Sequence, residues 1–207
     1  MELRSQTEVG ISSDAYSFSR LLWCIDMVNG EFFDLKEHIR SIPGWPEPHV
    51  TFRDICSLLE DKYFFRKSID LFIHRYFNTK IDAVVGIDAR GFIIGAPIAY
   101  ELNAGFIPVR KKGKLPGDTI SEAYTLEYGN AEIEIQKSAL RKGDQVILID
   151  DLIATGGTML AASNLLEKLG VEIIEAAAII DLPDLGGSSM LRKSGLTVHT
   201  FCEFEGD

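Results

Sequence analysis

The chain has 207 residues, of which 46% are hydrophobic and 25% are charged. This length and composition predict one folded domain with at most a small appendage, and they argue against a disordered or fibrous chain. Acidic residues outnumber basic ones by 31 to 21, which gives a formal charge of −10, so we expect no nucleic-acid partner.

The first 26 residues are rich in serine and weakly patterned, apart from the apolar patch 21–25. Met27 opens a stretch that resembles a second possible chain start. We therefore predict an N-terminal extension of unknown role over residues 1–26 and a single domain over residues 27–207. The alternatives for the extension are a packing arm and a membrane-surface anchor, although the patch is short and poor in Lys and Arg for an anchor.

Two further observations bear on location. No apolar run approaches the roughly 20 residues that cross a bilayer, and the polar start lacks the pattern of a secretory signal. Cys24, Cys56 and Cys202 are widely spaced, which favours neither a disulfide framework nor a zinc site and suits a reducing compartment. We expect a cytoplasmic protein without a membrane partner.

Three elements are expected between residues 34 and 77. A short helix over 34–41 ends before Pro43 and Gly44. Residues 42–52 contain three prolines and predict an extended loop, because each proline keeps its predecessor out of the helical region. The next segment carries apolar side chains at helical spacing and predicts an amphipathic helix. These side chains are Phe65, Ile69, Phe72, Ile73 and Phe77.

Short apolar runs rich in β-branched residues alternate with helical patterns in the rest of the chain. Strands are expected at 81–87, 106–109, 145–149, 173–180 and 197–202. Helices are expected at 92–102, 156–169 and 185–193. This alternation predicts an α/β fold with a doubly wound, mostly parallel sheet and helices on both faces. In such sheets ligands bind at the carboxyl ends of the strands.

The strand expected at 145–149 ends at Asp150 and Asp151, and a loop of small residues then leads into a helix. That loop consists of Ala154, Thr155, Gly156, Gly157 and Thr158. Its backbone N–H groups and hydroxyls, helped by the helix dipole, suit a phosphate, although a plain glycine-rich turn with a threonine cap is the simpler alternative.

The two aspartates favour the phosphate interpretation. Carboxylates beside a phosphate repel it unless they accept hydrogen bonds from hydroxyls or act through Mg²⁺. A ribose 5-phosphate meets both conditions, with its phosphate on the loop and its hydroxyls on Asp150 and Asp151. No Lys follows Gly157, and no Gly-x-Gly-x-x-Gly occurs here, so a triphosphate P-loop and a dinucleotide fingerprint are excluded.

Two cationic segments extend this prediction. Arg90 lies in Gly-Ile-Asp-Ala-Arg-Gly-Phe (86–92), where its guanidinium can bind a pyrophosphate through two hydrogen bonds. Residues 110–117 carry four cations, which suit a leaving pyrophosphate, although a solvated basic turn is the alternative. Residues 124–129 follow in the same long segment between the strands predicted at 106–109 and 145–149. This segment predicts a flexible lid hairpin over about 110–130.

With these motifs the chain resembles the type I phosphoribosyltransferases, and within them the branch that uses adenine. The resemblance extends from about Met27 to the C-terminus. It implies that adenine and phosphoribosyl pyrophosphate react to adenosine monophosphate and pyrophosphate in purine salvage. It further implies a homodimer and a Mg²⁺ cofactor, which is bound through substrate and water with no direct protein ligand.

The resemblance also implies residue roles. A hood over about residues 27–60 would bind adenine through Val50, Thr51, Phe52 and Arg53, with Phe52 stacked on the base. His49 stands where the family commonly has Gly, and Thr51 stands where an apolar residue is usual.

For the chemistry, the residues that the resemblance implies fall into two groups. Pyrophosphate would bind to Arg90, Arg110, Lys111, Lys114 and Tyr128. The catalytic residues would be Arg90, Asp150, Asp151 and Glu127. Glu127 would manage the proton at the imidazole edge of adenine, unless it is a lid residue that pairs with a lysine. Two alternatives for the whole chain are a phosphoribosyltransferase for another base and a non-catalytic regulator that senses phosphoribosyl pyrophosphate.

Overall fold

The computed structural model describes residues 34–126 and 129–206. The predicted extension 1–26 and the first part of the predicted hood lie outside these residues. So do the predicted site residues Glu127 and Tyr128. The main body is Leu35–Asp207, which forms a compact unit by itself.

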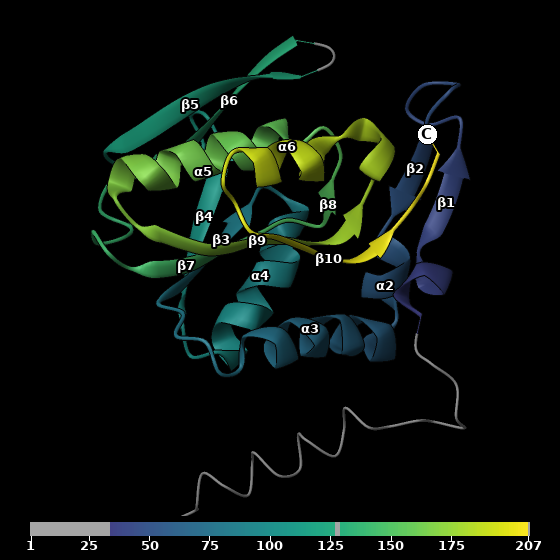
Figure 1. The fold of residues 1–207 in the computed structure, drawn as a ribbon, viewed down its shortest axis with the longest axis horizontal. Coiled ribbons are helices and arrows are strands. Elements are labelled where there is room, and N and C mark those ends of the chain that lie inside the picture. The colour runs from purple at the N-terminus through teal and green to yellow at the C-terminus, as the bar shows by residue number, and fades with distance from the viewer. Residues whose placement is uncertain (1–33, 127–128, 207) are drawn as a thin grey trace, which may run out of the picture. The chain divides into compact units, whose positions relative to one another are not determined.

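A mostly parallel sheet forms the centre of this unit (Figure 1). Its parallel strands are β3 (Ala83–Ile87), β4 (Gly105–Lys111), β7 (Gln145–Ile149), β9 (Glu172–Asp181) and β10 (Val198–Glu203). The sheet continues into antiparallel β5 (Thr119–Leu126) and β6 (Gly129–Gln136), in the order β10–β9–β7–β3–β4–β6–β5. The short strand β8 (Leu152–Ile153) pairs with β9. The predicted strands are therefore confirmed.

Helices cover both faces of the sheet, as the alternating pattern predicts. Figure 1 shows α3 (Lys62–Tyr76) and α4 (Arg90–Glu101) on one side and α5 (Gly157–Leu169) and α6 (Gly187–Lys193) on the other. Within the described residues no helix has the length and apolar character needed to cross a membrane.

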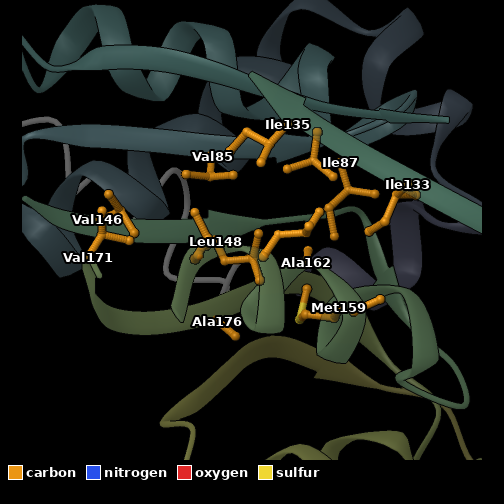
Figure 2. Close-up of a cluster of buried hydrophobic side chains, with 14 of the residues drawn as sticks. Val85, Ile87, Ile133, Ile135, Val146, Leu148, Met159, Ala162, Val171 and Ala176 are labelled. Carbon is orange, nitrogen blue, oxygen red and sulfur yellow. The ribbon is translucent and has the colours of Figure 1, made fainter. Parts of the chain in front are cut away.

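A cluster of buried hydrophobic side chains lies between the sheet and α5 (Figure 2). Successive side chains of a strand point to opposite faces of the sheet. Val85 of β3 and Leu148 of β7 point to the face that α5 covers, and both are fully buried. Met159 and Ala162 of α5 complete the layer. Both faces of β3 and β7 are buried, which explains their continuous apolar sequences. This packing fixes the strand ends that carry the polar residues described below.

The segment before α3 differs from its prediction. The expected helix at 34–41 is only a 3-10 turn, η1 (Leu35–His38). The ends of the expected loop 42–52 form a two-stranded antiparallel sheet of β1 (Arg40–Pro43) and β2 (Thr51–Asp54), and α2 (Cys56–Glu60) follows. The prolines correctly predict an extended backbone, but cross-strand pairing of short segments leaves little signal in the sequence.

The range predicted as a flexible lid, about 110–130, overlaps an antiparallel hairpin of β5 and β6, which pair from Thr119↔Gln136 to Leu126↔Gly129. Its base is held against α5, because Glu122 of β5 accepts hydrogen bonds from Asn164 at 3.0 Å and from Lys168 at 2.5 Å. These hydrogen bonds therefore anchor the base of the hairpin to α5, the helix that follows the phosphate loop.

Candidate active site

The paired aspartates lie at the carboxyl end of β7, where the sequence predicts them. Asp151 is buried, and its backbone N–H donates to the Asp150 carboxylate at 2.9 Å. Burial of the Asp150 carboxyl, followed by the neighbouring charge of Asp151, raises its pKa well above the usual value. Burial and the neighbouring carboxylate therefore both disfavour the ionised form of Asp150.

Arg90, the first residue of α4, connects this pair to the hood. Its guanidinium forms an ion pair with the Asp151 carboxylate, and it lies 5.7 Å from the ring centre of Phe52 in β2. Arg90 and Asp151 are separated by 61 residues in the chain. The fold thus brings together three predicted site residues from distant parts of the chain.

The phosphate loop, residues 154–158, lines a cavity of about 150 Å³ together with Asp150, Leu152, Ile153 and Met159. It leads directly into α5, whose first-turn N–H groups have no partner within the helix. Gly156 has φ +78°, a left-handed conformation that favours glycine. A small cavity at a helix N-terminus, lined in part by threonine residues and by Asp150, suits a sugar phosphate.

Gly187 supports the phosphate loop from behind, and the sequence analysis did not identify it. Its N–H donates to the Ala154 carbonyl at 3.1 Å. A Cβ at Gly187 would lie 2.1 Å from that carbonyl oxygen and 2.6 Å from the Gly156 nitrogen. Only glycine permits α6 to begin against the loop. The pair Gly186-Gly187 was a visible signal, but the sequence does not show what it contacts.

The cationic loop, residues 110–117, leaves the end of β4. Arg110 donates to the Asp88 carboxylate at 3.2 Å and to the Lys114 carbonyl at 3.1 Å. Lys112 is paired with Glu132 at 2.7 Å. Lys111 and Lys114 are exposed. Asp88 is a second residue that the sequence analysis did not single out, although it lies two residues before Arg90.

The hood presents Phe52 beside the site. The Phe52 ring packs edge-on against Trp45, with centroids 4.5 Å apart, and Arg53 donates to Ser41 at 2.7 Å. The Val50 carbonyl already accepts the N–H groups of Gly44 and Trp45. Among the described residues β2 pairs with β1 alone. The outer edge of Thr51–Asp54 can therefore pair with a planar base, and Val50 is less suited to this role.

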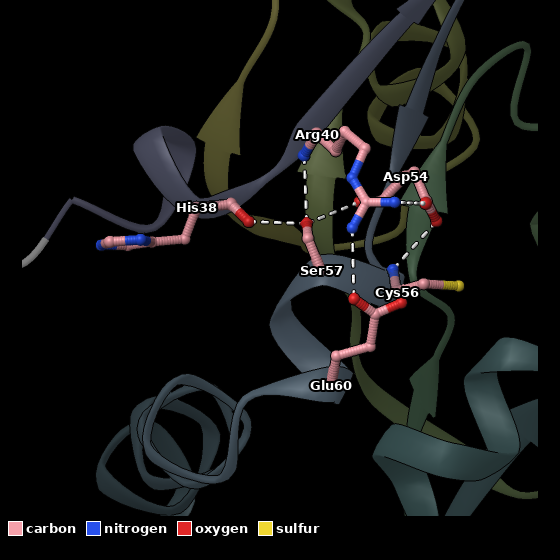
Figure 3. A network of polar contacts seen from close by, with 6 residues as sticks. All are labelled: His38, Arg40, Asp54, Cys56, Ser57 and Glu60. Atoms are coloured by element: carbon pink, nitrogen blue, oxygen red, sulfur yellow. Dashed lines mark hydrogen bonds and ion pairs between the residues drawn. The ribbon is translucent and has the colours of Figure 1, made fainter.

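A polar network fixes the hood to the helix below it (Figure 3). The Ser57 hydroxyl donates to the His38 carbonyl at 2.7 Å and accepts the Arg40 N–H at 3.1 Å. The Arg40 guanidinium reaches Glu60 at 3.1 Å and Asp54 at 3.9 Å. These contacts tie the start of β1 and the end of β2 to α2, and so they position Phe52.

A second cavity, of about 270 Å³, lies between the hood and the loop after β9. His49, Val50 and Thr51 line it from the hood side, and Leu182, Asp184, Leu185 and Gly206 line it from the other. His49 is exposed, as expected for a loop residue. The mixed apolar and polar lining of this second cavity suits a flat heteroaromatic group.

The paired aspartates, Arg90 and the cationic loop follow the carboxyl ends of the parallel strands β7, β3 and β4. Among the residues that the structure describes, no cluster of three or more His, Cys, Asp or Glu side chains could hold a metal ion. Residues 57–202 match the family described as "Phosphoribosyl transferase domain", the class of protein that this fold and site define.

Individual relatives identify the branch. Adenine phosphoribosyltransferase of Marinobacter nauticus is 61% identical over 173 residues, which cover 84% of this chain and 96% of that protein. The crystal structure of adenine phosphoribosyltransferase from Rhodothermus marinus has a TM-score of 0.77 and 43% identity, and covers 82% of this chain and 96% of that one. The Saccharomyces cerevisiae enzyme, complexed with adenine and an imino-altritol bisphosphate, has a TM-score of 0.77 and 38% identity, with 81% and 96% covered. The chain belongs to the adenine phosphoribosyltransferase family.

Proposed function

We propose that this protein transfers the 5-phosphoribosyl group from phosphoribosyl pyrophosphate to N9 of adenine, which yields adenosine monophosphate and pyrophosphate. The position of Arg90 between Asp151 and Phe52 carries this proposal. An arginine that lies between a ribose-binding acid and a base-binding ring can bind the pyrophosphate at the carbon where the two substrates react.

Each substrate group has its own part of the site in this proposal. The 5-phosphate binds to the phosphate loop, the ribose hydroxyls to Asp150 and Asp151, and the base to the free edge of β2 beneath Phe52. Adenine has a donor at N6 and an acceptor at N1, so it can pair with a strand edge as another strand would. These contacts hold the anomeric carbon in line for attack.

Displacement at the anomeric carbon builds positive charge on the sugar. The charge on Asp151 stabilises that transition state, and it is fully available once Arg90 turns from Asp151 to the pyrophosphate. Arg110, Lys111, Lys114 and Tyr128 bind the remaining pyrophosphate oxygens. Of these, Tyr128 lies outside the described residues.

Mg²⁺ fits this site as a cofactor that substrate and water hold. The ion takes oxygen ligands, which substrate phosphates, ribose hydroxyls and water would supply, and Asp150 and Asp151 would hold the ribose hydroxyls in place. When bound, it would neutralise charge on the leaving pyrophosphate. The chain's own cations would bind the oxygens that the ion leaves free.

Glu127 is the proposed acid–base residue for the imidazole edge of adenine. It lies outside the described residues, between the ends of β5 and β6. This assignment rests on the family resemblance.

We further propose a homodimer in the cytoplasm. Ile93, Ala96, Pro97 and Tyr100 occupy one face of α4 at helical spacing. Ile93 is 45% exposed and Tyr100 is 83% exposed, so this apolar stripe suits contact with a second copy. Cys56 is a free thiol, which suits a reducing compartment.

The function is tested by incubating the purified protein with phosphoribosyl pyrophosphate, Mg²⁺ and one labelled base at a time. Adenine should yield its monophosphate, and hypoxanthine, guanine and xanthine should react at least about 100-fold more slowly, since the base edges differ in donors and acceptors. A preference for another base, or no nucleotide product with adenine, would contradict the proposal.

A further inference from the structure

Glu134 is a buried carboxylate of β6 that no step of the proposed reaction uses. Its residue is only 4% exposed, and it lies opposite Arg110 in the antiparallel pairing of β6 with β4. A charged group is costly to bury without partners, so its contacts indicate what it does.

Its hydrogen-bond partners come from the segment that joins β4 to β5 and from the first residue of β5. One carboxylate oxygen accepts the backbone N–H groups of Lys114 and Leu115, each at 2.9 Å. The other accepts the Thr119 hydroxyl at 3.2 Å. The N–H groups of Leu115 and then Lys114 outweigh burial and lower the pKa of Glu134. The carboxylate is therefore ionised at neutral pH.

Two more contacts hold the same loop. Gln136 donates to the Pro116 carbonyl at 2.9 Å, and Arg110 donates to the Lys114 carbonyl at 3.1 Å. The backbone of the cationic loop is thus bound on its inner side by β6 and β4. The side chains of Lys111 and Lys114 remain exposed, and within the described part of the chain neither makes an ion pair.

We propose that Glu134 is a positioning residue, which fixes the cationic loop so that its lysines are arranged for pyrophosphate before substrate binds. The inference rests on the proposed function. A loop that is already ordered loses less conformational entropy on binding. Glu134 therefore acts through the loop and touches no substrate.

The test compares three substitutions. Glu134→Ala removes both acceptors, and Glu134→Asp keeps the charge but withdraws the oxygens by one methylene. Both should raise the KM for phosphoribosyl pyrophosphate by at least about tenfold, because backbone donors lose their partner. Glu134→Gln should stay within about threefold of wild type. Its amide oxygen can accept both N–H groups, and its NH₂ can donate to Thr119.

Adenosine monophosphate separates this role from general damage to the fold, since it has no pyrophosphate group. Its Kd should stay within about twofold in every variant, whereas the Kd of inorganic pyrophosphate should rise together with the KM. Equal losses for both ligands, an unchanged KM in Glu134→Ala and Glu134→Asp, or a Gln variant as impaired as Ala would each overturn the inference.

Glu132→Ala is the matched control. Glu132 lies two residues earlier on the same strand, but it bonds the side chains of Lys112 and Ser121. Its loss should change the KM less than about twofold, and an effect equal to that of Glu134→Ala contradicts the inference. Lys114→Ala tests the proposed pyrophosphate site separately. If Lys114→Ala raises the KM while the Glu134 variants do not, only the inference about Glu134 fails. If Lys114→Ala leaves the KM unchanged, the assignment of Lys114 to the pyrophosphate site fails as well.

Discussion

Single backbone atoms decide the shape of the phosphate-binding cavity. Gly187 and the phosphate loop lie in van der Waals contact, and there is no room for a side chain between them. Packed interiors yield little to added atoms. An added methyl group at this point must move either the loop or the start of α6.

We predict that Gly187→Ala weakens binding of adenosine monophosphate at least about tenfold, because displacement of the loop misplaces its N–H groups. Isothermal titration calorimetry measures this directly. Gly105→Ala is the control, since its new Cβ would meet its nearest neighbour at 3.6 Å, an ordinary contact. Wild-type affinity in Gly187→Ala would show that the loop adjusts without cost.

Glu127→Leu tests the proposed acid–base residue. We expect kcat to fall at least about 100-fold with a modest change in KM, which is the scale of one acid–base contribution. Steady-state kinetics with adenine and phosphoribosyl pyrophosphate give both constants. Glu122→Gln is the control from the same hairpin, because Glu122 bonds α5 instead. Unchanged turnover in Glu127→Leu would remove Glu127 from the chemistry.

At the scale of elements, α3 packs against the sheet through a buried polar cluster. Arg75 and Tyr76 donate to Glu175 of β9, at 2.6 Å and 2.7 Å respectively. Although burial opposes it, these hydrogen bonds lower the pKa of Glu175. The neighbouring His199 of β10 has a buried Nε2 without a hydrogen-bond partner among the described residues.

This cluster predicts a pH-dependent stability. Burial, followed by the charge of Arg75, lowers the pKa of His199 from its ordinary value of 6.5. The charge of Glu175 opposes this shift but does not cancel it. Just below pH 6.5 the unfolded chain therefore binds more protons than the folded one, and the free energy of unfolding falls as the pH is lowered.

Urea unfolding at pH 7 and at pH 5 measures this effect. We expect the wild-type protein to lose more stability between these two values than His199→Gln, which cannot titrate. Glu175 stays ionised through this range because its pKa is lowered. An equal loss in both proteins would show that His199 does not cause the dependence.

For the whole molecule, the apolar stripe on α4 predicts the assembly. Light scattering should give a dimer near 46 kDa, twice the chain mass of 23.0 kDa. Ile93→Asp combined with Tyr100→Asp should give a monomer, because two charges in an apolar contact are left without partners. Circular dichroism checks that the variant is folded. A dimer that persists in the variant places the interface elsewhere.

Local patterns carry a large share of this architecture. The strands β3 and β7 are apolar runs bounded by polar residues, β9 is apolar over most of its length, and α5 follows a glycine-rich turn. Such signals depend only on neighbours in the chain, which is why the α/β sheet could be predicted from the sequence. The observed strand order confirms this prediction. The hood strands β1 and β2 were missed, since each is short and stabilised by the other.

The sequence by itself determined the family, the sheet with helices on both faces, and the paired aspartates followed by the phosphate loop. These depend on residue type and spacing over a few positions. Only the tertiary structure decided that Arg90 meets Asp151 and Phe52, that Gly187 supports the phosphate loop, and that Glu134 binds the cationic loop. Those contacts join residues far apart in the chain, and the packing of strands and helices, rather than local preference, sets their distances.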